Sequence, residues 1–175
     1  MLRSILLIIL MSASQLAMAY SYTLEITGQE LQNKISSMMP MERKLLVVSV
    51  IISEPKVTLI KESNKIGIFT HIAVIAPDGA KSTGRVSFTG TLNYDANQGA
   101  FYFHNPVIEK LEIDNLPEQY AADMQQITQL AVSSAMAAYP VYKLQNDDLR
   151  QKYVKSVLES IAVHDGKLVV TLKAF

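Results

Sequence analysis

The residues in this sequence that are suited to acid–base or metal chemistry are three histidines and a scatter of carboxylates. His71, His104 and His164 are far apart in the chain, whereas zinc sites on a helix usually place two histidines four residues apart. No serine lies in the G-x-S-x-G pattern of a nucleophile elbow. Asp147 and Asp148 are adjacent, but carboxylates also favour the first turn of a helix. We therefore predict no catalytic residues, no metal site, no cofactor and no enzymatic activity.

Nucleotide or nucleic-acid binding is not indicated either. The stretch STGRVSFTG, residues 82–90, lacks the spacing and the lysine of a phosphate-binding loop, and its glycines are typical of bends in a strand. The 16 basic residues equal the 16 acidic ones, and no basic stripe suited to nucleic acid occurs. The sequence also lacks the polybasic segment that an anionic membrane surface attracts.

The first 19 residues have the features of a secretory signal peptide. Arg3 precedes an apolar run, and Ala17-Met18-Ala19 forms a small-x-small cleavage site. The run is too short to span a bilayer, and no later segment is apolar enough to do so. The chain has no cysteine, which excludes disulfides and a lipidated cysteine. We expect cleavage after Ala19 and a periplasmic, non-lipidated mature chain, residues 20–175, that forms a single domain.

A helix is predicted directly after the expected start of the mature chain. Thr27 and Glu30 have the spacing of a capping box, and Ile26 and Leu31 occupy the two positions of a hydrophobic staple. Pro40 is expected to end the helix. The apolar residues of the helix recur at the spacing of one buried face: Leu31, Ile35, Met38 and Met39.

Strands separated by short turns follow this helix. Apolar and β-branched residues predict strands over 44–53, 56–61, 65–76 and 82–95. Residues 100–114 are expected to form two short strands that are split near Asn105-Pro106. Because short turns join successive strands, the sheet should be mostly antiparallel.

A second, longer helix is predicted over 118–138, after Pro117, because this segment lacks glycine and proline and shows helical spacing. Its expected buried face contains Tyr120, Met124, Ile127, Leu130 or Ala131, Ser134 and Ala138. Beyond it, Asn146-Asp147-Asp148 is expected to cap a short helix over 149–155. A closing hairpin with its turn at 164–167 would place Val157, Ile161 and Val163 opposite Leu168, Val170 and Leu172. These elements define an α+β domain.

Two of the strands carry apolar residues on both faces. In 44–52 and in 65–76, successive residues on opposite sides of the strand are both apolar. Antiparallel sheets usually leave one face in water, and a bare apolar patch of about 400 Å² would cost on the order of 10 kcal/mol. We therefore expect both faces to be covered by the two helices, a partner subunit or a bound lipid.

The sequence resembles the YceB-like family of bacterial envelope proteins over essentially the whole mature chain. The resemblance is carried by ITGQELQNKI, ISEPKVTLI, GTLNYDANQGAFYFHNPVIEKLEIDNLP, YPVYKL and VHDGKLVVTL. The best-known members carry a lipidated cysteine that this chain lacks. The family is similar in fold to the tubular lipid-binding (TULIP) proteins. This resemblance implies a curved, mostly antiparallel sheet wrapped around the helix at 118–138, with an apolar channel for lipid.

Our leading hypothesis is a periplasmic protein that binds a lipid or another long apolar molecule in this channel. Methionines adapt to irregular apolar shapes, which suits such a channel. The expected wall residues are Leu31, Ile35, Met38, Val48, Val50, Ile68, Ile72, Met124 and Ile127. The alternative is a structural or adaptor protein of the cell envelope with a fully packed core, possible also as a homodimer. A third hypothesis, a hydrolase, requires His71 and distant carboxylates to converge in one cleft.

Overall fold

The computed structural model describes residues 21–45, 48–144 and 157–173. These residues form a three-stranded sheet, a six-stranded sheet and two α-helices. The small sheet has the order β1-β9-β8 and the large sheet runs from β2 to β7 in sequence order. Every neighbouring pair of strands is antiparallel, so the predicted α+β class and antiparallel pairing are confirmed.

The small sheet contains β1 (Ser21–Thr27), β8 (Val157–His164) and β9 (Lys167–Lys173). The large sheet contains β2 (Met41–Leu45), β3 (Val48–Ile60), β4 (Lys65–Ile75), β5 (Lys81–Asp95), β6 (Ala100–Ile113) and β7 (Tyr142–Lys143). The helices are α2 (Gly28–Met38) and α3 (Ala121–Ala138), and short 3-10 turns occupy Lys61–Ser63 and Glu118–Tyr120.

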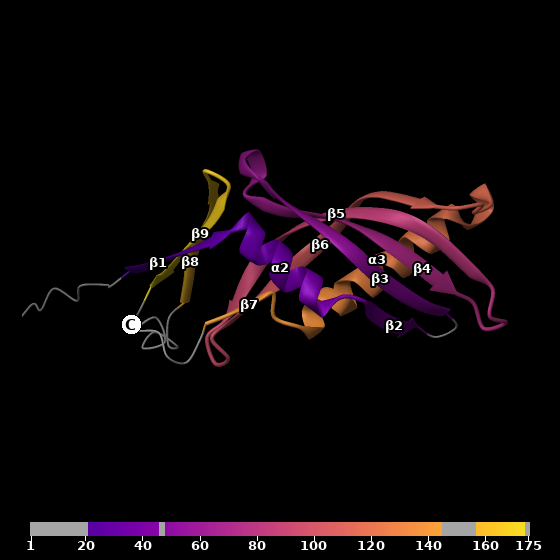
Figure 1. The fold of residues 1–175 in the computed structure, drawn as a ribbon, viewed down its shortest axis with the longest axis horizontal. Coiled ribbons are helices and arrows are strands. Elements are labelled where there is room, and N and C mark those ends of the chain that lie inside the picture. The colour runs from indigo at the N-terminus through magenta and orange to yellow at the C-terminus, as the bar shows by residue number, and fades with distance from the viewer. Residues whose placement is uncertain (1–20, 46–47, 145–156, 174–175) are drawn as a thin grey trace, which may run out of the picture.

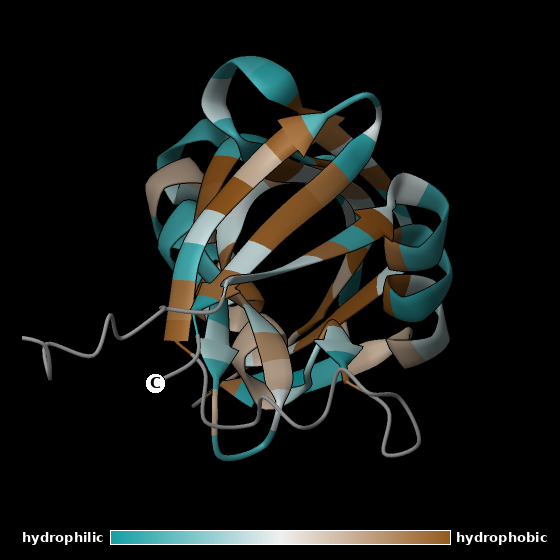
Figure 2. Cartoon of the chain, turned by 90° about the vertical axis from the view of Figure 1, so that its left-hand side faces the viewer, coloured by the Kyte–Doolittle hydropathy of each residue, from teal (hydrophilic) through white to brown (hydrophobic). Residues whose placement is uncertain are grey.

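The molecule is elongated, with the small sheet at one end and the long strands of the large sheet reaching the other (Figure 1). Helix α3 packs on β6, and it also contacts β2 and β3 near the opposite edge of the same sheet. The large sheet is therefore curved, and Figure 2 shows its strands in an end-on view along the long axis. The single sheet of the sequence prediction is wrong, since the closing hairpin and β1 form a separate sheet, and neither sheet is closed into a barrel.

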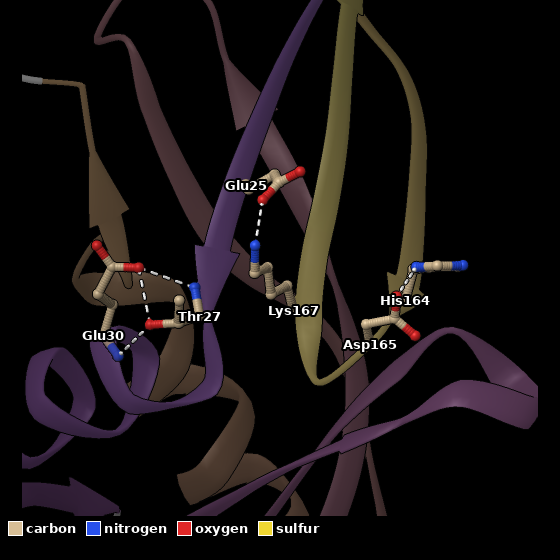
Figure 3. Close-up of polar contacts among 6 residues, drawn as sticks. All are labelled: Glu25, Thr27, Glu30, His164, Asp165 and Lys167. Atoms are coloured by element: carbon tan, nitrogen blue, oxygen red, sulfur yellow. Dashed lines mark hydrogen bonds and ion pairs between the residues drawn. The ribbon is translucent and has the colours of Figure 1, made fainter.

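Helix α2 begins where its capping residues predict. The Thr27 hydroxyl oxygen accepts from the Glu30 backbone N–H at 3.1 Å, and the Glu30 carboxylate accepts from the Thr27 backbone N–H at 2.8 Å (Figure 3). This capping box satisfies two N–H groups that a helix start otherwise leaves without partners. In the adjoining small sheet, Lys167 Nζ of β9 donates to the Glu25 carboxylate of β1 at 2.6 Å. The cap thus joins the small sheet to the first helix.

Three of the predicted strand boundaries are wrong. The predicted strands 44–53 and 56–61 are not separated at Glu54-Pro55, because β3 runs through it from Val48 to Ile60. The predicted strand 44–53 is divided between β2 and β3, which pair with each other, so that Leu45 lies opposite Val48. In contrast, residues 100–113 form one strand, β6, although Asn105 has a positive φ of 47°. The chain continues through Asn105-Pro106 because the pairing with β5 shifts register there. Such a bulge absorbs a residue without ending a strand.

The inner face of the large sheet is buried, whereas its outer face is only partly covered. Val50, Ile68 and Ile72 are at most 1% exposed. On the outer face Ile51 and Ile75 are half-buried and Phe69 is 38% exposed. The expectation that both faces are covered is therefore not met by the described residues. Polar residues on the neighbouring strand lie beside these outer-face residues. Ile75 pairs with Lys81, and His71 pairs with Arg85.

The predicted helix at 118–138 is confirmed as a 3-10 turn followed by α3. Its buried face differs in part from the predicted one. Leu130 is 63% exposed and Tyr120 is 49% exposed, and Ser134 and Ala138 are also exposed. The fully buried residues of α3 are Thr128, Ala131, Val132, Ala135 and Met136. The small residues made the position of this face ambiguous, since alanine and serine fit either side of a helix.

The closing hairpin is confirmed as β8 and β9. Ile161 lies opposite Val170 and Val163 opposite Leu168, as predicted, but Val157 lies opposite Lys173 and is 44% exposed. A register shift between Leu158 and Ser160 brings Leu158 opposite Leu172 instead. The predicted signal peptide at 1–19 and the predicted capped helix at 146–155 lie outside the described residues.

Candidate ligand-binding interior

One apolar cluster runs through both sheets and both helices. It joins Leu24 and Ile26 of β1 and Val170 of β9 to the inner face of the large sheet and to α3. Among the described residues, few polar side chains are buried in this interior. Burial of such a cluster is the main favourable term in folding, and its continuity along the molecule defines the candidate site.

The nine predicted wall residues all belong to this cluster or pack against it, but they differ in burial. Five of them are 0–1% exposed and therefore act as core in this structure: Leu31, Ile35, Val50, Ile68 and Ile72. The remaining four are half-buried: Met38, Val48, Met124 and Ile127. The interior is therefore closed to solvent at the five buried residues and partly exposed at the four half-buried ones.

Three of these four, Val48, Met124 and Ile127, lie towards the end of the large sheet remote from the small sheet. We call this the distal end, where β2 ends, β3 and β5 begin, β4 and β6 end, and α3 begins (Figure 1). The half-buried apolar residues there come from four segments and pack on the core: Leu45, Val48, Leu111, Met124 and Ile127. Part of the apolar interior is therefore half-exposed at the distal end.

Two polar groups in the interior lack hydrogen-bond partners among the described residues. They are the Thr128 hydroxyl of α3 and the Tyr94 phenol of β5. Burial raises the pKa of Tyr94, and the neighbouring Asp95 carboxylate raises it further. In contrast, the buried Thr70 hydroxyl donates to the backbone carbonyl of Ser53. Buried polar groups are nearly always paired, so Thr128 and Tyr94 mark places where a partner would stabilise the interior.

A glutamine fastens each helix to a strand of the large sheet. On α3, Gln129 Nε2 donates to the Pro106 carbonyl at 2.6 Å, and Gln129 Oε1 accepts from the Ile108 N–H at 3.2 Å. On α2, Gln32 Nε2 donates to the Pro55 carbonyl at 2.7 Å, and its Oε1 accepts from the Val57 N–H at 2.8 Å. Each amide therefore pairs with the strand as another strand would.

The two glutamine contacts occupy equivalent places in the sheet. Each follows a residue of positive φ, Glu54 or Asn105, and the proline after it has no N–H to donate. Both positions lie beyond the stretch that an edge strand covers, since β2 pairs with β3 up to Ile52 and β7 pairs with β6 only at 100–101. The glutamines therefore satisfy strand edges that would otherwise be open. The signals available in the sequence were Pro55 and Pro106, each of which was predicted to interrupt a strand.

Among the described residues, the surface clefts are open to solvent and are lined by both polar and apolar side chains. One of about 570 Å³ lies between the end of α2 and β3–β4 and is lined by Met39, Pro40, Pro55, Phe69 and His71, among others. In it, His71 Nδ1 lies 3.3 Å from the Glu54 carboxylate, and both side chains are largely exposed. Of the nine predicted wall residues, Val48 lines one of the described clefts, with Lys44, Leu45 and Pro77.

Several other charged groups form ion pairs on the surface. Lys110 Nζ lies 2.6 Å from the Glu112 carboxylate and Arg85 lies 3.3 Å from it. The hydrogen bond from Lys110 holds the pKa of Glu112 below its usual value, and the positive charges of Lys110 and Arg85 act in the same direction. A hydrogen bond to the Glu25 carboxylate raises the pKa of Lys167 above its usual value. Exposed pairs of this kind contribute little to stability.

Metal-binding clusters and membrane-spanning helices are absent from residues 21–45, 48–144 and 157–173. No group of three or more histidine, cysteine, aspartate or glutamate residues there is arranged to hold a metal ion. None of the helices described is both long and apolar enough to cross a membrane.

The fold and interior define an α+β protein in which two open antiparallel sheets and two helices enclose one apolar core. The chain matches the family model described as "Protein of unknown function (DUF1439)" over residues 26–167. Because the match covers most of the sequence, the chain belongs to this family. A search of curated proteins found no match.

Proposed function

We propose that this chain is a non-enzymatic periplasmic protein that binds a lipid or another long apolar molecule between the large sheet and α3, in the manner of the YceB-like and TULIP proteins that it resembles. The observation that carries the proposal is the continuous apolar interior, which becomes half-exposed at the distal end. The ligand enters there, along Val48, Met124 and Ile127. The signal peptide, cleaved after Ala19, delivers the chain to the periplasm.

The energetics allow such a ligand to bind. Burying an acyl chain of about fourteen carbons yields roughly 11 kcal/mol at about 0.8 kcal/mol per methylene. Part of this is lost to the entropy of association and to conformational change. Because Ile68 and Ile72 are already buried, a ligand that passes the distal end must move α3 away from the sheet. Met124 and Ile127 lie on the part of α3 that is less buried than its second half, which is where separation costs least.

The test combines the native cargo with directed variants. The protein is purified without denaturant, an organic extract is examined by mass spectrometry, and the uptake of a fluorescent fatty acid is measured. Ile127→Asp should lower the uptake strongly, because it places a charge at the half-buried entrance. Leu130→Asp is the matched control, since Leu130 lies on the same helix but is 63% exposed. Circular dichroism checks that both variants fold.

The absence of lipid in the extract, together with no uptake by the wild-type chain, would refute the proposal. Equal uptake by Ile127→Asp and Leu130→Asp would place any bound ligand elsewhere than the distal end.

A structural or adaptor role in the envelope is the second candidate. It is favoured by the complete burial of Leu31, Ile35 and Val50, as in a core that needs no ligand. This role predicts an empty protein whose stability is unchanged by fatty acids. It also allows a homodimer, which analytical ultracentrifugation would detect.

A further inference from the structure

One arginine lies among apolar residues on the inner face of the large sheet. Cross-strand partners in direct register lie on the same face of a sheet. Arg43 of β2 pairs with Val50 of β3, which pairs with Val74 of β4 and is 0% exposed. Arg43 therefore occupies an inner-face position. Its own side chain is half-buried, because β2 is the edge strand of the sheet.

The other inner-face positions of the large sheet are uncharged in the described residues. They can be followed by register from the buried residues of each strand. Those of β3 and β4 are Val48, Val50, Ile52, Val57, Leu59, Ile66, Ile68, Thr70, Ile72 and Val74. Those of β5 and β6 are Ser82, Gly84, Val86, Phe88, Gly90, Leu92, Tyr94, Phe101, Phe103, Ile108, Leu111 and Ile113. A charge at Arg43 thus departs from the pattern of the face.

The contacts of Arg43 leave much of its guanidinium unused. One Nη donates to the backbone carbonyl of Glu42 at 2.8 Å, and the guanidinium carbon lies 5.7 Å from the centre of the Tyr139 ring. No carboxylate among the described residues forms an ion pair with it. A guanidinium has five N–H donors in a fork that fits a carboxylate or a phosphate.

We propose that Arg43 binds the anionic head of the ligand, so that the ligand is a single-chain amphiphile with a carboxylate or phosphate head. This inference rests on the proposed function. The head lies at the edge of β2, beside the guanidinium of Arg43 on the side not covered by the Tyr139 ring, and the apolar chain extends inward over Val50 and Val74. The half-buried position of Arg43 suits this arrangement, because water still reaches the head while the chain is removed from it.

The experiment compares four probes of equal chain length on the full chain: a fatty acid, a lysophosphatidic acid, a fatty alcohol and a monoacylglycerol. The wild-type protein should bind the two anionic probes at least about tenfold more tightly than the neutral ones, as a charge-assisted pair requires. Arg43→Gln should remove this preference and leave the affinity for the neutral probes unchanged. A difference between fatty acid and lysophosphatidic acid identifies the head.

Two further variants separate charge from structure. Arg85→Gln is the matched control, because Arg85 lies on the outer face and pairs with Glu112, and it should keep the preference. Arg43→Lys should retain part of the preference, because it keeps the charge but loses the fork, and it provides a test even if thermal unfolding shows that Arg43→Gln folds poorly. Added salt should weaken the binding of the anionic probes more than that of the neutral probes.

The outcomes are distinct. Binding of neutral and anionic probes with equal affinity, or an unchanged preference in a folded Arg43→Gln, overturns the role of Arg43 and leaves the proposed function standing. Failure of all four probes to bind the wild-type chain overturns the proposed function and this inference with it.

Discussion

Replacement of Gln129 by alanine tests whether the glutamine contacts hold the helices on the sheet. The substitution removes the bond from Nε2 to the Pro106 carbonyl and the bond from the Ile108 N–H to Oε1. Both bonds are part-buried, so the backbone groups that lose their partner are not fully compensated by water. Each hydrogen bond contributes about 0.5–1.5 kcal/mol net, while the better helix propensity of alanine returns a few tenths of a kcal/mol, roughly.

The expected loss in the free energy of unfolding is therefore about 2 kcal/mol, which corresponds to a Tm lowered by roughly 4–8 °C for a chain of this size. The assay is urea and thermal unfolding followed by circular dichroism. Gln126→Ala is the control, because Gln126 is an exposed glutamine on the same helix and the substitution has the same effect on propensity. Hydrogen exchange should also show faster exchange of the Ile108 amide in Gln129→Ala alone.

Free energies of unfolding of Gln129→Ala and Gln126→Ala within about 0.5 kcal/mol of each other would show that the glutamine contacts do not hold α3 on the sheet, since that difference is the size of an ordinary surface effect. Unchanged protection of the Ile108 amide would lead to the same conclusion independently.

Three other predictions concern separate parts of the molecule. Thr128→Val should leave stability equal or raise it by up to about 1 kcal/mol in chemical denaturation, because the buried hydroxyl has no partner among the described residues; a clear loss would show that a partner exists. Gly90→Ala should lower stability by about 1–3 kcal/mol, because a Cβ would overlap the Phe103 ring and lie 2.8 Å from the His104 carbonyl oxygen; unaltered urea unfolding would contradict this. Because the pKa of Glu112 is lowered in the folded chain, its stabilising effect is present above its usual value of 4.5 and is lost as the pH falls through the lowered pKa. Glu112→Gln should accordingly flatten the pH dependence of Tm below about pH 4.5, and an identical slope in both proteins would argue against it.

Local sequence signals predicted the elements whose ends are set by neighbouring residues. The start of α2 follows from Thr27 and Glu30, and the turn between β8 and β9 follows from Asp165-Gly166, where φ is positive at both residues. These interactions span a few residues, so their spacing is visible in the chain. The confirmed α+β class rests on the same local periodicities.

The predicted strand boundaries that are wrong depend on pairing between residues far apart in the chain. Nothing local distinguishes a strand over 44–53 from the observed division into β2 and β3, because the stretch is mostly apolar and rich in β-branched residues throughout. Likewise Asn105-Pro106 predicted a break in β6, but Gln129 of α3 supplies the hydrogen bonds that the bulge needs. A contact between residues more than twenty positions apart has no signature in the spacing of either segment.

For the candidate site, the sequence by itself determined that the chain has a large apolar surface on β-strands and little chemistry beside it. Only the tertiary structure decided which apolar residues form the closed core, as Ile68 and Ile72 do, and which remain half-exposed at the distal end, as Val48 and Ile127 do. It also decided that Arg43 lies on the inner face, since register fixes which side of a sheet a residue occupies. The physical reason is that composition sets how much apolar area must be buried, whereas the curvature and pairing of the sheet set where it is buried and what lies next to it.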